Sequence, residues 1–77
     1  MNRQRRKRLE AIIERLQSAR DELESIRDEE MEAYDNMPDG LKDGERGEAI
    51  SENCDELDSA CDGLDGIVEI IQECIER

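Results

Sequence analysis

The sequence predicts an all-α fold, an antiparallel helical hairpin that dimerises into a four-helix bundle. First, residues 32–48 hold the only proline, the only aromatic residue and three of the five glycines of the 77-residue chain. Second, apolar residues recur every three or four positions on either side of this stretch, as in amphipathic helices. Third, a single core in so short a chain rarely contributes more than about 3–5 kcal/mol. We therefore expect one domain, residues 1–77, that associates with a second copy.

The first helix is predicted over residues 6–35. Its apolar residues are alternately three and four apart, which is typical of a coiled-coil seam, and they are Leu9, Ile12, Leu16, Ala19, Leu23 and Ile26. Ile13 broadens this seam on one side. The preceding residues 2–8 are basic and show no such period, so we interpret them as a frayed start of the helix.

The connection is predicted over residues 36–44. Met37 precedes a proline and is therefore disfavoured in a helix. The sequence Pro38-Asp39-Gly40 is typical of a turn, because proline presets φ and glycine adopts the backbone angles at the end of a turn without steric strain. Asp43 or Gly44 is expected to cap the second helix.

The second helix is predicted over residues 45–76. Its seam repeats at intervals of four and three and consists of Ile50, Cys54, Leu57, Cys61, Leu64, Val68, Ile71 and Ile75. Near its end the helix is apolar almost all round, which favours burial by more than one neighbour. We therefore place the dimer interface at Ile67, Ile70, Ile71 and Cys74.

The two seams predict one common register. When the chain folds back near Lys42, facing residues such as Leu16 and Val68 have numbers that sum to 83 or 84 along the whole hairpin. This register places Arg5 and Arg8 beside Glu73 and Glu76, so we expect the basic start to be compensated by the acidic end.

The charge balance limits the partners. The formal net charge is −12, although residues 1–8 carry five basic side chains and no acid. An acidic body repels phosphates, which disfavours direct nucleic-acid binding, whereas a basic protein face would attract it. The odd number of cysteines and the lack of an apolar leader or a membrane-length apolar run favour a cytoplasmic protein with free thiols.

Catalysis and cofactor binding are disfavoured. The chain has no histidine and no phosphate-binding or nucleophile motif, so we expect no enzyme activity and no cofactor. Residues 58–69 match parts of a calcium-binding loop, but Ala60 stands where a ligand is needed. The same residues continue the helical seam, so we expect no metal site.

The outer face of the second helix is acidic. Carboxylates recur there every three or four residues without an intervening basic residue, at Glu48, Glu52, Asp55, Asp58, Asp62, Asp65 and Glu69. Such a face can keep a small bundle soluble, bind a basic protein surface, or imitate DNA. Its spacing of about 5.4 Å per turn is wider than the ~3.4 Å per phosphate of one DNA strand.

The connecting tip is a second candidate surface. Tyr34, Met37, Leu41 and Arg46 could together bind a partner. The favoured interpretation is structural: Tyr34 and Leu41 close the end of the bundle, and Arg46 pairs with Asp35 or Glu32.

The central segment carries a recognisable motif. Its residues Tyr34, Asp35, Asn36, Met37, Pro38, Leu41, Glu45, Arg46, Gly47 and Glu48 resemble the centre of a family of short acidic helical proteins encoded by bacteriophages and prophages. Gly44 stands where that family carries serine. The resemblance implies a phage context and binding to a host protein.

We therefore expect a non-enzymatic, homodimeric protein that binds a host defence or regulatory factor stoichiometrically in the cytoplasm. One alternative is an acidic DNA mimic that blocks a DNA-binding enzyme. Another is a small-ligand or nucleic-acid binder that uses the basic N-terminus, namely Arg3, Arg5, Arg6, Lys7 and Arg8.

Overall fold

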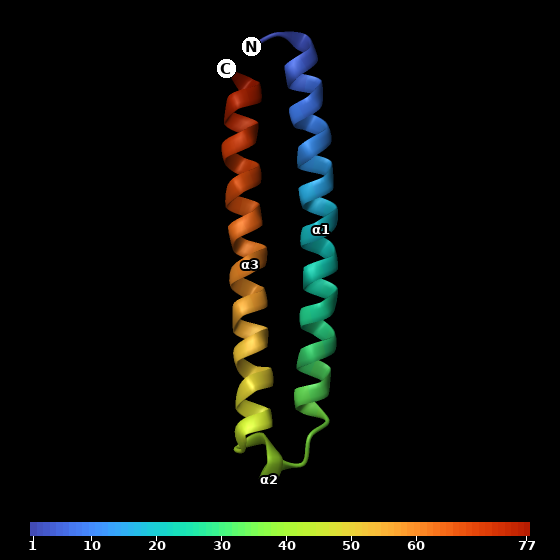
Figure 1. The fold of residues 1–77 in the computed structure, drawn as a ribbon, viewed down its shortest axis with the longest axis vertical. Coiled ribbons are helices and arrows are strands. Elements are labelled where there is room, and N and C mark those ends of the chain that lie inside the picture. The colour runs from blue at the N-terminus through green and yellow to red at the C-terminus, as the bar shows by residue number, and fades with distance from the viewer.

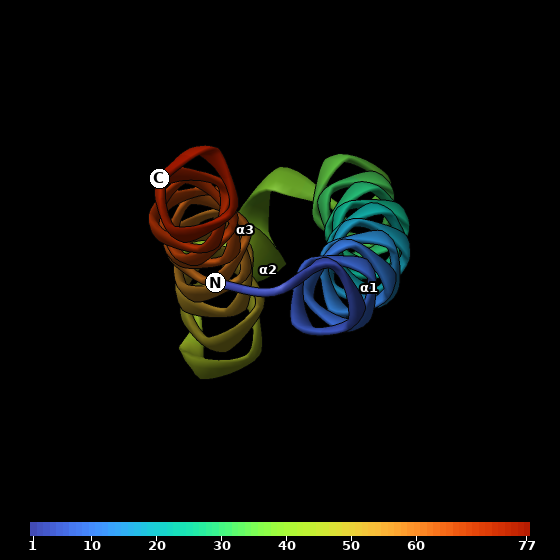
Figure 2. The same ribbon diagram turned by 90° about the horizontal axis from the view of Figure 1, so that it is seen from above.

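The computed structural model describes all 77 residues and confirms the helical hairpin. Helix α1 (Arg3–Asp35) is followed by a one-turn helix, α2 (Asp39–Lys42), and by α3 (Glu45–Glu76), which returns beside α1. Both termini lie at one end and α2 at the other (Figure 1). The molecule measures 59 × 15 × 13 Å, and Figure 2 shows α1 and α3 side by side in a single layer.

Helix α1 begins earlier than predicted. The side-chain Oδ1 of Asn2 accepts a hydrogen bond from the backbone N–H of Arg5, at 2.8 Å. This cap satisfies one of the free N–H groups of the first turn. The basic segment is therefore ordered helix from Arg3 onward and not a frayed start.

The connection is a compact reversal. The backbone N–H of Leu41 donates to the carbonyl of Pro38 at 2.8 Å, and that of Gly44 donates to the carbonyl of Leu41 at 3.1 Å. Gly44 is the N-cap of α3 but supplies no side-chain cap. One turn later, Gly47 is buried against α2, where a Cβ would lie 2.7 Å from the Cα of Lys42 and even closer to its carbonyl group.

The predicted seam of α3 is confirmed. Cys54, Cys61 and Val68 are buried, and the other five seam residues are half-buried. Cys61 also donates its S–H to the backbone carbonyl of Arg20, with a sulfur–oxygen distance of 3.8 Å. Both cysteines therefore act as small core residues, as expected of buried thiols.

The seam of α1 is rotated relative to the prediction. Ile13 is the buried residue of this helix, whereas Ile12, Ala19 and Ile26 are exposed. The rotation brings Arg20 and Arg27 toward α3, where they meet carboxylates. Half of the predicted seam is consequently left on the surface.

Polar contacts between the helices fix the register. Arg20 pairs with Asp65 and Arg27 with Asp58, and the numbers of each pair sum to 85. Asn53 donates to Glu30 at 3.3 Å, a pair whose numbers sum to 83. The observed register thus lies within one residue of the predicted one. None of the three helices combines the length and apolar character needed to cross a bilayer.

Candidate interaction surfaces

Two arginines of α1 form a row of ion pairs along one side of the hairpin. Arg20 Nε lies 3.2 Å from Asp65 Oδ1 and also contacts Glu24, and Arg27 contacts Asp58 and Asp28. Hydrogen bonds to Asp58 and Asp28 raise the pKa of Arg27. Partial desolvation opposes the same change at Arg20, but the charges of Asp65 and Glu24 outweigh it and raise the pKa. Both guanidinium groups are therefore permanently charged links between the helices.

These pairs divide the predicted acidic surface of α3. Asp58 and Asp65 are engaged by arginine, whereas the other five residues are exposed and form no ion pair. We call these five the carboxylate face: Glu48, Glu52, Asp55, Asp62 and Glu69. From Glu48 to Glu69 the face extends about 32 Å along the helix.

The resemblance of residues 58–69 to a calcium loop has no structural counterpart. Asp58 to Glu69 lie within the uninterrupted helix α3. No group of three or more acidic or cysteine side chains is arranged to hold a metal ion.

The tip differs from the structural interpretation. Tyr34 is half-buried, with Lys42 Nζ 5.4 Å from its ring centroid, a cation–π contact. Leu41 does not close the bundle, because it is 58% exposed on α2. Arg46 is exposed and pairs with neither Asp35 nor Glu32. Met37 is half-buried.

The basic start is not compensated as predicted. Arg5 and Arg8 are exposed and form no ion pair with Glu73 or Glu76. The acids that form ion pairs between the helices, Asp58 and Asp65, are bound by Arg27 and Arg20 instead. The charges of Arg5 and Arg8 are therefore available for other contacts.

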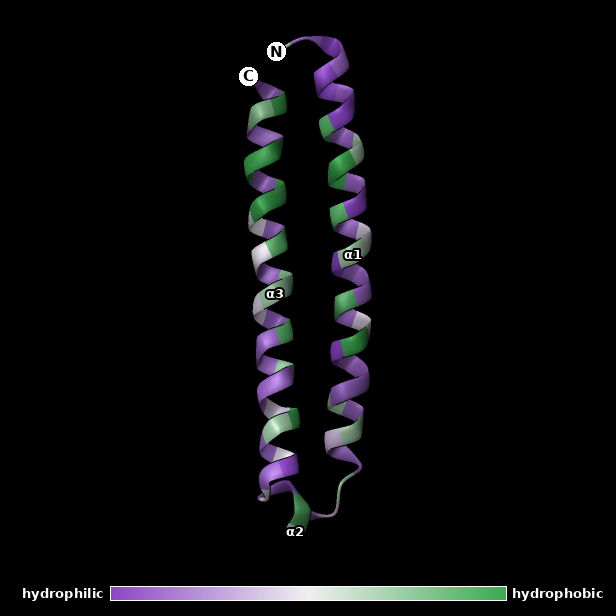
Figure 3. Cartoon of the chain, in the orientation of Figure 1, coloured by the Kyte–Doolittle hydropathy of each residue, from purple (hydrophilic) through white to green (hydrophobic).

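The side opposite the row of ion pairs is apolar. It carries two rows of residues spaced by seven, or about two helical turns, which we call the apolar face: Ile12, Ala19 and Ile26 on α1, and Ala60, Ile67 and Cys74 on α3. Ile67 is 47% exposed and Ile70, at its outer edge, is 63% exposed. The predicted dimer residues Ile71 and Cys74 are half-buried. Figure 3 shows the hydrophobic residues of α3 gathered toward its C-terminal end.

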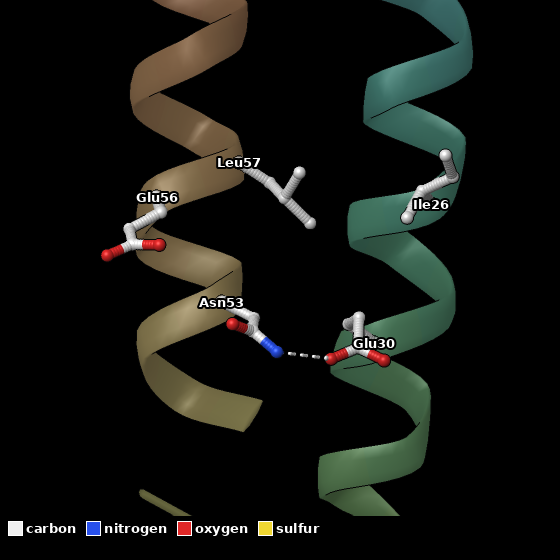
Figure 4. Close-up of a pocket in the computed structure, with 5 residues that line it drawn as sticks. All are labelled: Ile26, Glu30, Asn53, Glu56 and Leu57. Carbon is white, nitrogen blue, oxygen red and sulfur yellow. Dashed lines mark hydrogen bonds between the residues drawn. The ribbon is translucent and has the colours of Figure 1, made fainter. Parts of the chain in front are cut away.

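The two ends of the apolar face carry opposite charge. At one end Ile26, Glu30, Asn53, Glu56 and Leu57 line a shallow groove, in which Asn53 bonds Glu30 beside Leu57 and Ile26 (Figure 4). At the other end Arg5, Arg8, Leu9 and Ile12 line a second hollow with Met1. The first is edged by carboxylates and the second by guanidinium groups.

The surroundings of Cys54 disfavour its thiolate form. Burial raises its pKa, and the negative charge of Glu30 adds to the effect. A thiol must ionise to attack, so this environment lowers the reactivity of Cys54. All three cysteines are free.

Sequence reasoning missed the roles of Arg20, Arg27 and Glu30. The signal for the arginines was present, since Arg20 and Arg27 are seven residues apart and so are Asp58 and Asp65. Glu30 lies four residues after Ile26, where the seam would continue with an apolar residue, and nothing in the sequence indicates its hydrogen bond to Asn53.

Comparison with protein families, curated proteins and solved structures finds no match to this chain.

Proposed function

We propose that this chain is a non-enzymatic, phage-type protein that binds stoichiometrically, as a homodimer in the host cytoplasm, to a protein with a basic surface. A host defence or regulatory factor is the proposed target. The phage context rests on the motif between Tyr34 and Glu48. The binding proposal rests on the carboxylate face.

The observation that carries the proposal is the difference between paired and unpaired acids on α3. Asp58 and Asp65 already have arginine partners, so their charge is satisfied within the hairpin. The five residues of the carboxylate face have none. Unpaired carboxylates aligned over about 32 Å create a negative field that steers basic proteins to this side and favours complementary contacts.

A close DNA mimic is less well supported. One hairpin carries a net charge of −12 over a length of 59 Å, and two paired copies carry twice that charge over a similar length, or about one charge per 2.5 Å, against one per ~1.7 Å in duplex DNA. A protein that recognises the charge density of DNA would therefore meet a weaker field.

The basic N-terminus is an alternative binding surface. The first turns of α1 expose Arg3, Arg5, Lys7 and Arg8 without ion pairs, and such a cluster could hold an anionic ligand. Reversing the charges of Arg3 and Lys7, which have no role in the inferred dimer interface, should weaken binding under this alternative and leave it intact if the carboxylate face is the site.

The test begins with affinity capture from infected host cells, followed by binding measurements on the purified partner. The double variant Asp55→Asn/Asp62→Asn should weaken binding about tenfold, because it removes two unpaired charges from the centre of the face. The matched control Glu22→Gln/Glu29→Gln removes two exposed, unpaired charges, also seven apart, from α1 and should leave the affinity unchanged.

Two results would contradict the proposal. Equal affinities for the two double variants would show that the carboxylate face is not the site. Binding that is insensitive to salt would show that charge does not drive the contact, because exposed charges are screened over about 10 Å at 0.1 M salt. Competition by duplex DNA would favour the mimic.

A further inference from the structure

The hairpin exposes more surface than its mass requires. Its accessible surface is 5968 Å², whereas a compact monomer of 8.9 kDa exposes about 4,800 Å². The excess of roughly 1,150 Å² is larger than the ~800 Å² that one partner contributes to a standard protein interface. No large side chain is completely buried. A second layer of helices would supply the missing cover.

The apolar face is symmetric about its middle. On α1, Ile12 and Ile26 are each seven residues from Ala19, and on α3, Ala60 and Cys74 are each seven residues from Ile67. The register that pairs Arg20 with Asp65 places Ala19 and Ile67 at nearly the same height along the hairpin. One two-fold axis perpendicular to the helices can therefore pass through the middle of both rows.

Such an axis superimposes apolar residues on apolar residues. Ile12 of one copy would lie opposite Ile26 of the other, Ala19 opposite its own equivalent, and Ala60 opposite Cys74. Alanine at the axis lets the two α1 helices approach closely, and the isoleucines fill the space on either side. An isologous contact of this kind needs one self-complementary patch, which is what the two rows provide.

The charges at the ends of the apolar face select the orientation. Arg8 and Glu30 are each eleven residues from Ala19, in opposite directions. The perpendicular axis therefore places Arg8 of each copy opposite Glu30 of the other. A two-fold axis along the helices would instead bring the two carboxylate-edged ends together, with Glu30 facing Glu56 of the second copy, and like charges there would repel.

We infer that two copies pair through their apolar faces about a two-fold axis perpendicular to the helices, with Arg8 of each copy facing Glu30 of the other. This inference rests on the homodimer in the proposed function and specifies its geometry. It places Ile67 and Cys74 inside the interface and leaves the carboxylate face on the outside of the assembly.

A charge-swap cycle tests the orientation. The dimer dissociation constant is measured by sedimentation for Arg8→Glu, for Glu30→Arg and for the double variant. Each single reversal should raise the constant roughly tenfold, since it places two pairs of like charges at the interface, and the double variant should return to within about threefold of the original chain. Glu14→Arg, an exposed and unpaired position elsewhere on α1, is the control and should have no effect. Circular dichroism confirms that each variant is helical.

A cysteine trap provides the second measurement. In a Cys74→Ser background, Ala19→Cys should form a cross-linked dimer under mild oxidation, because two copies of this position meet at the axis. Ser25→Cys, on another side of α1, should not. Absence of the Ala19→Cys cross-link, or of rescue in the charge-swap double variant, would overturn the inferred orientation.

The outcome is separable from that of the binding proposal. A monomer at micromolar concentration that still binds the partner through Asp55 and Asp62 would overturn the dimer and leave intact the proposal that the carboxylate face is the binding site. A dimer that passes both tests but binds no basic protein would support the inferred dimer and overturn the binding proposal.

Discussion

At the scale of single residues, Gly47 shows that the reversal of the chain requires a residue without a side chain at this position. The residue lies in the first turns of α3, where glycine normally weakens a helix. Here the backbone of Lys42 occupies the space that a side chain would need. Gly66, in contrast, has nothing within 4 Å of the position of a Cβ. The two glycines therefore have opposite effects on stability although both are helical.

Replacing these glycines with alanine should separate the two effects. Gly47→Ala should lower the free energy of unfolding by about 1–3 kcal/mol, because the new methyl group collides with backbone that cannot move away. Gly66→Ala should raise it by about 0.8–1 kcal/mol, the gain in helix propensity. Urea denaturation of the two variants measures both changes. Equal shifts in the same direction would contradict the close approach of α2 to α3.

At the scale of elements, the arginine–aspartate pairs explain how α1 is oriented. Apolar spacing alone predicts that Ile12, Ala19 and Ile26 face α3, and the structure shows them exposed. Arg20 follows Ala19 and Arg27 follows Ile26, so turning the arginines toward α3 rotates the preceding apolar residues away by about 100° each. The rotation pairs Arg20 and Arg27 of α1 with two aspartates of α3, and it buries Ile13 in place of the exposed residues.

The sequence therefore predicted α3 better than α1. The seam of α3 has no competing cross-helix basic residue, so its apolar period alone determines which side is buried. The seam of α1 competes with Arg20 and Arg27, and a pattern of hydrophobicity cannot weigh an ion pair against an exposed isoleucine. The exposure of Leu41 was missed for a different reason, since the direction of a side chain on a single helical turn depends on backbone angles that the sequence does not display.

Exchanging one ion pair tests this account of the register. Arg27→Asp should lower the urea midpoint, because Asp58 would then face another acid. The double variant Arg27→Asp/Asp58→Arg should recover most of the loss, since the pair is restored in reverse. The unpaired Arg15→Asp serves as a control for the change in charge. Failure of the double variant to recover would mean that Arg27 stabilises the hairpin by packing and not through Asp58.

At the scale of the whole molecule, the hairpin is a thin layer with a core that is open on one side. The layer is one helix deep, because α1 and α3 lie side by side with no further long helix against them (Figure 2). Residues such as Leu64 and Ile71 therefore remain half-buried, and an additional layer would complete their burial. Stability should accordingly depend on association.

Thermal unfolding as a function of concentration tests that dependence. If two copies unfold together, a tenfold increase in protein concentration should raise Tm by roughly 5 °C, from the average unfolding enthalpy of a chain pair of this size. Circular dichroism over a hundredfold concentration range measures the shift. A Tm that is independent of concentration would mean that the single hairpin is the folded unit.

The placement of the carboxylate face and the apolar face on different sides of this layer has one more consequence. If the apolar faces are hidden against each other, two identical acidic surfaces point outward in opposite directions. The assembly is then bivalent and can bridge two copies of its target. Each bridge would gain from avidity, because the second attachment occurs at a high effective concentration, so modest charge contacts would suffice to sequester an abundant host protein.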